Sequence, residues 1–130
     1  MKILLLIFTL LISFDAFACK CDEFNVSGYV KLSDKAYIGE LLNFSEFGNK
    51  GLVSASLKVT ESFVGQMYDI EEAIITTKNV CGLTLKEGEK YIVFETQSGL
   101  VNFCTMQNMK DVQNLEWNLQ VLRDLREKGI

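Results

Sequence analysis

Four cysteines and the absence of histidine limit the chemistry that this chain can perform. The cysteines are Cys19, Cys21, Cys81 and Cys104, and the 130 residues include no histidine. An even number of cysteines in an exported chain indicates two disulfides. Zinc ligation is the competing interpretation, but the C-x-C spacing around Lys20 is tight for zinc. We therefore expect two disulfides, no metal of the protein's own and no cofactor.

The N-terminus has the pattern of a signal peptide. Lys2 precedes an apolar stretch over residues 3–14, and Ala16-Phe17-Ala18 forms an A-x-A cleavage site. The apolar stretch is shorter than the roughly 20 residues that a membrane span requires. We expect residues 1–18 to be removed, no membrane span, and a secreted or periplasmic domain over residues 19–130.

Lipoprotein processing is the alternative, because a cysteine stands directly after the cut. Phe17 is bulky where a lipoprotein site usually has a small residue, and Ala16 replaces the usual Leu or Val. Ordinary cleavage is therefore favoured over acylation and membrane anchoring at Cys19.

Cleavage would give Cys19 a free α-amino group beside its own carbonyl. These two groups can form a five-membered chelate on a catalytic zinc, which keeps an open coordination position. An α-amino pKa near 8 makes the neutral, metal-binding form accessible. The spacing alone also fits a simpler role, in which Cys19 and Cys21 only fasten the N-terminus to the domain.

The sequence offers little for catalysis or nucleic-acid binding. It has no histidine base and no recognisable Ser or Lys nucleophile motif, so we expect no enzymatic activity. The net charge of −4 and the absence of a basic run argue against nucleic acid. Five glutamates are expected on exposed strand faces or loops, where water solvates them: Glu40, Glu46, Glu61, Glu71 and Glu72. We expect the protein to be a monomer.

Alternating apolar and polar residues predict a mainly β domain. The pattern is clearest over Val53 to Val59, and Gly39 interrupts a strand pattern as a bulge would. Five strands are the minimum, and a closed or partly open five-stranded barrel fits their spacing. The other predicted strands are Tyr37 to Phe44, Ile74 to Thr77, Tyr91 to Phe94 and Leu100 to Thr105.

Helices are expected at both ends of the domain. A short one is predicted between Asn25 and Ser33, and a longer amphipathic one near the C-terminus, with Asp111 as its N-cap and Gly129 as its stop. We expect its apolar stripe to cover the barrel rather than bind a partner. The stripe consists of Val112, Leu115, Leu119, Leu122 and Leu125.

The order of these motifs resembles that of the tissue inhibitors of metalloproteinases. That family begins its mature chain with Cys-x-Cys, continues with a helix and an oligonucleotide/oligosaccharide-binding (OB) type barrel, also called netrin-like, and has a Cys-Gly after the third strand. The matching segments here are Cys19-Lys20-Cys21, residues 33–39, Phe63-Val64-Gly65, Cys81-Gly82, residues 88–94 and Cys104.

The resemblance implies a pairing, a mechanism and a partner. It implies disulfides Cys19–Cys81 and Cys21–Cys104, and a ridge that enters the cleft of a secreted zinc metalloendopeptidase. The amine and carbonyl of Cys19 would bind the catalytic zinc. The implied contact residues are Lys20, Cys21, Asp22, Lys78, Asn79 and Val80.

The chain departs from the family at the proposed contact. The family usually has Thr or Ser after the first cysteine, and this chain has Lys20, which implies a polar or acidic pocket in the target. Asp22-Glu23 replaces the usual prolines, and the chain has no proline. The alternative is a netrin-like binding module, secreted or lipid-anchored, that does not inhibit a protease.

Overall fold

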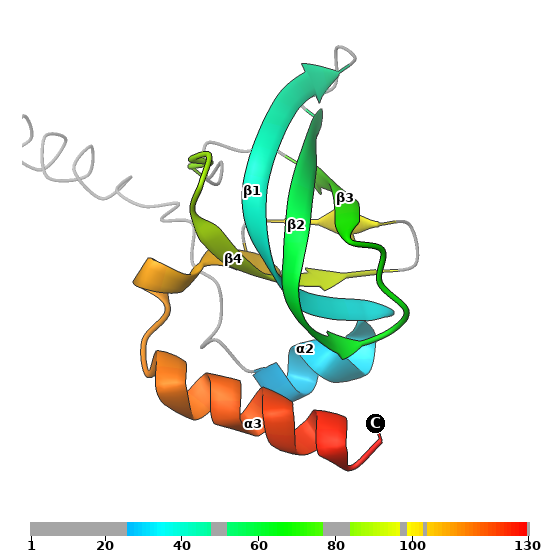
Figure 1. Ribbon diagram of the computed structural model, residues 1–130, viewed down its shortest axis with the longest axis vertical. Helices are drawn as coiled ribbons and strands as arrows, with labels where there is room; N and C mark the ends of the chain where they lie inside the picture. The colour runs from blue at the N-terminus through cyan, green and yellow to red at the C-terminus, as the bar shows by residue number, and fades with distance from the viewer. Residues whose placement is uncertain (1–25, 48–51, 77–83, 97–98, 103, 130) are drawn as a thin grey trace, which may run out of the picture.

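The computed structural model describes residues 26–47, 52–76, 84–96, 99–102 and 104–129. Within these ranges six strands and two α-helices follow one another, with one 3₁₀ turn, η2, before the last helix (Figure 1). Their bounds are α2 Val26–Leu32, β1 Lys35–Phe47, β2 Leu52–Val64, β3 Ile70–Thr76, β4 Lys90–Glu95, β5 Leu100–Val101, β6 Met106–Asn108, η2 Met109–Asp111 and α3 Leu115–Glu127.

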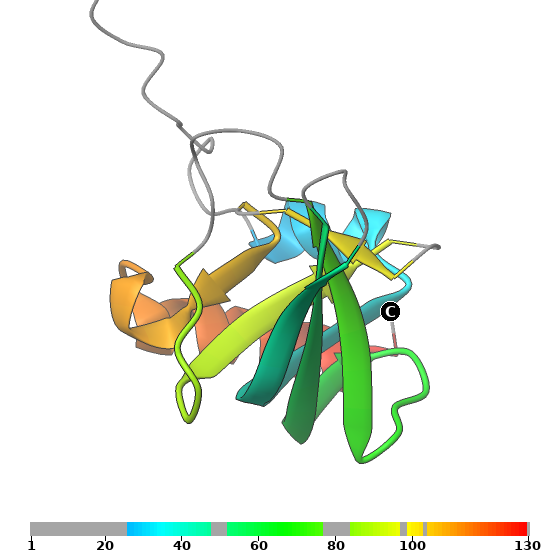
Figure 2. The same ribbon diagram turned by 90° about the horizontal axis from the view of Figure 1, so that it is seen from above.

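The six strands form one sheet in the order β5-β3-β2-β1-β4-β6, which confirms the mainly β prediction. Neighbouring strands are antiparallel except for the parallel pair β3 and β5. The two edge strands follow each other in the chain, because β5 ends at Val101 and β6 begins at Met106. Five Cα-to-Cα steps span at most about 18 Å, so the sheet must curl until its edges approach each other (Figures 1 and 2).

Bulges in β1 help to produce this curl. The pairing of β1 with β2 shifts register between Ile38 and Gly39, as predicted for a bulge at Gly39, and again between Leu41 and Asn43. A Cβ atom at Gly39 would lie 2.8 Å from the Cβ of Leu57. Glycine is therefore needed at this bend because β1 and β2 approach too closely for any side chain.

The sheet separates two apolar layers. On β4, Tyr91 and Val93 belong to the cluster inside the curled sheet, whereas Ile92 and Phe94 pack toward the helices. Both faces of β4 are therefore buried, which explains why the four residues Tyr91 to Phe94 are all apolar instead of alternating with polar ones.

The two helices lie side by side across the outer face of the sheet (Figure 1). Leu119 and Leu122 of α3 are buried in the outer layer, so the predicted packing role of the apolar stripe is confirmed. Arg123 and Arg126 also hold α3 to β2, since each places a guanidinium nitrogen 3.0 Å from the carboxylate of Glu61. No helix in the described ranges is long and apolar enough to span a membrane.

The start of α3 differs from the prediction. Asp111 lies in η2, and the helix begins at Leu115 after Asn114, whose φ of 53° is left-handed. Asn tolerates this conformation, which turns the chain sharply between the two helical segments. The end agrees with the prediction: Gly129 has a φ of 72°, and its N–H donates to the carbonyl oxygen of Arg126.

The prediction of one strand over Leu100 to Thr105 is also wrong. The segment contains β5, a turn and the approach to β6. The described part of the chain has six strands, where five were the predicted minimum. The Asn102 side-chain oxygen accepts hydrogen bonds from the backbone N–H groups of Cys104, at 2.8 Å, and Thr105, at 3.1 Å. An asparagine that bonds the backbone two and three residues ahead favours a turn over a continuous strand.

Candidate functional site

Most of the predicted inhibitory site lies outside the described residues. This applies to Cys19, Lys20, Cys21, Asp22, Lys78, Asn79, Val80 and Cys81. Cys104 is described and lies, partly buried, in the turn before β6. No cysteine in the described part of the chain is free. The pairings Cys19–Cys81 and Cys21–Cys104 remain predictions, because each includes a residue outside that part.

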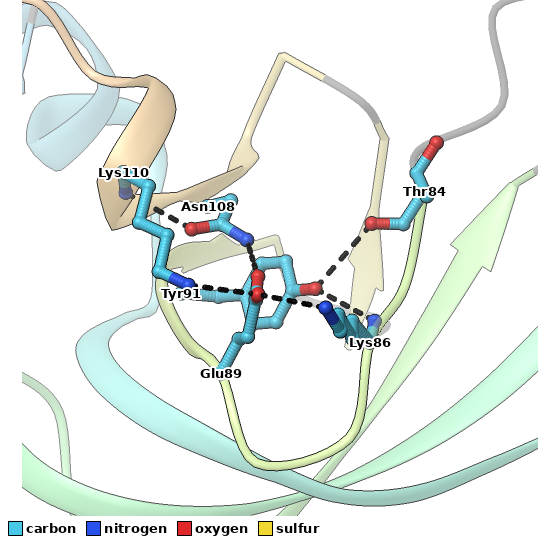
Figure 3. A network of polar contacts seen from close by, with 6 residues as sticks. All are labelled: Thr84, Lys86, Glu89, Tyr91, Asn108 and Lys110. Carbon is cyan, nitrogen blue, oxygen red and sulfur yellow. Dashed lines mark hydrogen bonds and ion pairs between the residues drawn. The ribbon is translucent and has the colours of Figure 1, made fainter.

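A polar network organises the part of the fold nearest to these predicted residues in sequence (Figure 3). Its centre is the carboxylate of Glu89, in the turn before β4. The Lys110 ammonium lies 3.0 Å from Glu89 Oε1, the Asn108 amide donates to Oε2, and the Lys86 ammonium lies 3.9 Å from Oε1. Lys110 first, and then Asn108, hold the pKa of Glu89 below its usual range. The network therefore joins the turn before β4 to β6 and η2.

Tyr91 extends this network to residues 84–86. Its ring is fully buried inside the sheet, and its hydroxyl accepts from the Lys86 N–H at 2.9 Å and donates to the Thr84 carbonyl at 3.4 Å. Burial raises the pKa of this hydroxyl. The first described residues after the predicted contact residues Lys78, Asn79 and Val80 are thus hydrogen-bonded to a residue of the inner core.

Backbone bonds hold the same turn to β1. The Leu41 N–H donates to the Glu89 carbonyl at 2.9 Å, and the Gly88 N–H donates to the Leu41 carbonyl at 2.8 Å. Gly88 has a φ of 85°, which favours glycine. Side chains and backbone together hold the turn before β4 to β1 on one side and to β6 on the other.

A second polar cluster is buried at the opposite end of β4. Glu95 is 3% exposed and accepts from the Tyr37 hydroxyl at 2.5 Å. Glu71 is 5% exposed, with the Lys35 ammonium 3.0 Å from Oε2 and the Tyr68 N–H donating to Oε1 at 2.7 Å. Both carboxyl groups face the protein interior, so a dissolved substrate has no direct access to them.

The prediction that Glu71 is exposed is wrong, and Glu95 was missed. In β3 the buried positions are Glu71, Ala73 and Ile75, so Glu71 shares the inner face with two apolar residues. Glu95 continues the inner-face alternation of Tyr91 and Val93. The two-residue alternation along each strand could have placed Glu71 and Glu95 on the inner face. It does so only when the bounds of the strand are known.

Burial governs the electrostatics of this cluster. Desolvation is the main cause that raises the pKa of Glu95. The hydrogen bond from Tyr37 lowers this pKa in part, and the nearby Glu71 carboxylate raises it further. Burial first, and then Glu95, raise the pKa of the Tyr37 hydroxyl, so it stays protonated. The hydrogen bond to Glu71 raises the pKa of Lys35. Within the described residues no group of three or more His, Cys, Asp or Glu side chains is arranged to hold a metal.

Comparison with known proteins adds no relative. No protein-family model matches this chain, and no curated protein matches it. The resemblance to the tissue inhibitors of metalloproteinases therefore rests on the order and spacing of the sequence motifs.

Proposed function

We propose that the mature protein is a secreted inhibitor of a zinc metalloendopeptidase, with an OB-type barrel as its scaffold. The observation that carries the proposal is the Cys19-Lys20-Cys21 motif directly after the A-x-A cleavage site. Signal cleavage there produces a cysteine whose amine and carbonyl lie on one residue, next to two potential disulfide anchors.

The mechanism is displacement of the water bound to the catalytic zinc of the target. The neutral α-amine and the carbonyl oxygen of Cys19 occupy the open coordination position, and the protease gains no scissile bond to cleave. Disulfides at Cys19 and Cys21 hold the chelate rigid, which lowers the entropy lost on binding. The amine must be deprotonated, so inhibition weakens as the pH falls below the α-amino pKa of about 8.

The scaffold supports this proposal. A contact ridge needs a rigid base, and the Glu89 network and the Tyr91 hydroxyl hold residues 84–86 to β4, β6 and η2. The turn that contains Cys104 enters β6 directly. The two described segments closest in sequence to the proposed disulfides therefore attach to the same pair of strands, β4 and β6. Residues 84–86 attach beside Tyr91, and the Cys104 turn attaches at the other end, beside Phe94.

Lys20 sets the specificity that the proposal implies. Its side chain follows the chelating residue and points into the adjacent pocket of the protease. Burying its ammonium group without a partner would cost several kcal/mol. The target protease therefore has an acidic or polar group in that pocket, and a Lys20→Thr variant should favour proteases with apolar pockets.

The experiment is an inhibition assay of the exported protein against a panel of secreted zinc endopeptidases. Intact mass first verifies that Cys19 has an unmodified amine. We expect inhibition of at least one protease, and competition with a small zinc-chelating inhibitor, since both need the same coordination position. Failure across the panel would favour the netrin-like binding module. An acyl group on Cys19 would exclude chelation and indicate the lipid-anchored form of that module.

A further inference from the structure

A pocket lies beside the buried carboxyl cluster, and none of the proposed inhibitory residues is among those that line it. Its volume is about 540 Å³, and it is lined by Asp34, Lys35, Gln66, Met67 and Tyr68. Asp34 directly precedes β1, Lys35 begins it, and the other three residues belong to the connection between β2 and β3, which runs beside the start of β1 in Figure 1. The volume is within the range of about 300–1,000 Å³ that is typical of small-ligand sites.

The walls of the pocket are fixed by contacts behind them. The buried Glu71 binds both walls, through the Lys35 ammonium on β1 and the Tyr68 N–H in the β2–β3 connection. Gly65, with a φ of 86°, brings that connection against β1, where an added Cβ would lie 2.4 Å from the Asp34 carbonyl oxygen. The pocket is thus built into the fold before any ligand arrives.

The charge around the pocket favours a cation. Glu71 neutralises Lys35 at 3.0 Å, whereas the Asp34 carboxylate is exposed and has no side-chain partner among the described residues. These three side chains sum to a charge of −1, and the Glu95 carboxyl lies behind them, close enough to raise the pKa of Lys35. A positively charged ligand therefore meets one unpaired carboxylate at the rim.

The remaining surface favours a planar cation with an apolar stem. Tyr68 is 77% exposed although it lines the pocket, so most of its ring is available for stacking. Met67 packs against the inner core and offers an apolar surface beside the ring. The Lys35 ammonium lies 5.8 Å from the ring centroid, which shows that the ring already accepts a cation. A guanidinium stacks on an aromatic face and pairs with a carboxylate through two parallel hydrogen bonds, which an ammonium cannot do.

We propose that this pocket binds the guanidinium group of an arginine side chain, with the Asp34 carboxylate as its hydrogen-bond acceptor and the Tyr68 ring as its stacking surface. The Gln66 amide lies on the same wall and can bond the backbone next to the arginine. The proposal does not depend on protease inhibition.

The test is an NMR titration of the ¹⁵N-labelled mature protein at low salt. The probe is N-acetyl-arginine methylamide, and the matched control probe is the citrulline analogue, which has a similar shape and no charge. We expect the arginine probe to change the amide chemical shifts of Asp34, Lys35 and residues 66–68. The affinity of the citrulline compound should be at least about tenfold lower. Two further probes, butylguanidinium and an arginine-containing tripeptide, show whether the natural ligand is a small molecule or a peptide. Equal affinity of the two probes indicates a small cation, and tighter binding of the tripeptide indicates a peptide ligand.

Four substitutions at three exposed positions sharpen the test. Asp34→Asn and Tyr68→Ala should each weaken binding of the arginine probe about tenfold, and Tyr68→Phe should retain it because the ring remains. Asp111→Asn, which removes an exposed carboxylate from η2, should leave binding unchanged. Equal binding of the citrulline compound, or full affinity in Asp34→Asn, would overturn the proposal.

Discussion

Two glutamates at opposite ends of β4 illustrate how one strand serves two different environments. Glu89, before the strand, is partly exposed and surrounded by donors, which lower its pKa. Glu95, at the end of the strand, is 3% exposed, and burial raises its pKa. The first carboxylate stabilises the fold when charged, whereas the second is destabilising when charged. The Glu89 end connects β4 to β6 and η2, and the Glu95 end lies behind the pocket that Asp34 and Tyr68 line.

The largest expected effect concerns the proposed disulfide of Cys104, which lies in the turn before β6, opposite the Glu95 end of β4. Cys104→Ser should lower the free energy of unfolding by about 4 kcal/mol, the value for closing a loop of this length. Urea unfolding measures the change. If Cys21 is the partner of Cys104, then Cys21→Ser and the variant with both substitutions should lose the same free energy of unfolding as Cys104→Ser. Non-reducing peptide mapping should recover the Cys21–Cys104 and Cys19–Cys81 pairs. Additive losses would contradict the pairing.

A smaller loss is expected at the buried end. Glu71→Leu leaves the Tyr68 N–H and the Lys35 ammonium without their acceptor, so it should destabilise the fold by about 2–3 kcal/mol. Glu72→Leu is the matched control, because Glu72 is the exposed neighbour on the other face of β3. Thermal unfolding should show a change within about 0.5 kcal/mol for this control. Equal effects of both variants would mean that the contacts of Glu71 contribute little.

Glu95→Gln should have the opposite sign. Because the folded-state pKa of Glu95 is raised, the wild type binds protons more tightly when folded, and its stability falls as the pH rises above the ordinary glutamate pKa of about 4.3. The Gln variant keeps an acceptor for the Tyr37 hydroxyl without the buried charge. It should gain about 1 kcal/mol at neutral pH and lose that pH dependence. Chemical unfolding at several pH values measures this, and destabilisation at every pH would contradict it.

The smallest effect is expected for Glu89→Gln. The lowered pKa means that the stabilisation is present above the ordinary glutamate pKa and is lost as the pH falls through the folded-state value. Since the ion pairs with Lys86 and Lys110 are largely exposed, added salt should reduce the difference from the wild type. Glu87→Gln, at an exposed position in the same turn, is the control. A salt-independent loss would indicate that Asn108 is the important partner instead.

Apolar periodicity predicted most of this fold. Alternation located β2, and the spacing of Leu119 and Leu122 located α3 with its buried stripe. The errors arose where a polar side chain acts locally. Asn102 produces a turn inside a predicted strand, and Asn114 delays the start of α3.

The polar sites were harder to predict, because they depend on contacts between distant strands. Glu71 meets Lys35 from 36 positions away in the sequence, and Tyr37 meets Glu95 from 58 positions away. Periodicity describes which face a residue occupies, but it does not identify a partner on another strand. The pocket beside Tyr68 likewise exists only because β1 and the β2–β3 connection are brought together.

The most direct test of the proposed function adds one residue to the mature chain. An alanine placed before Cys19 would move the α-amine out of the proposed chelate and change neither the cysteines nor the curled sheet. For a protease that the natural form inhibits, we predict normal folding of the extended form, verified by NMR. We also predict a loss of inhibition of at least about a hundredfold, equal to about 2.7 kcal/mol. Equal inhibition by the two forms would contradict zinc chelation by Cys19.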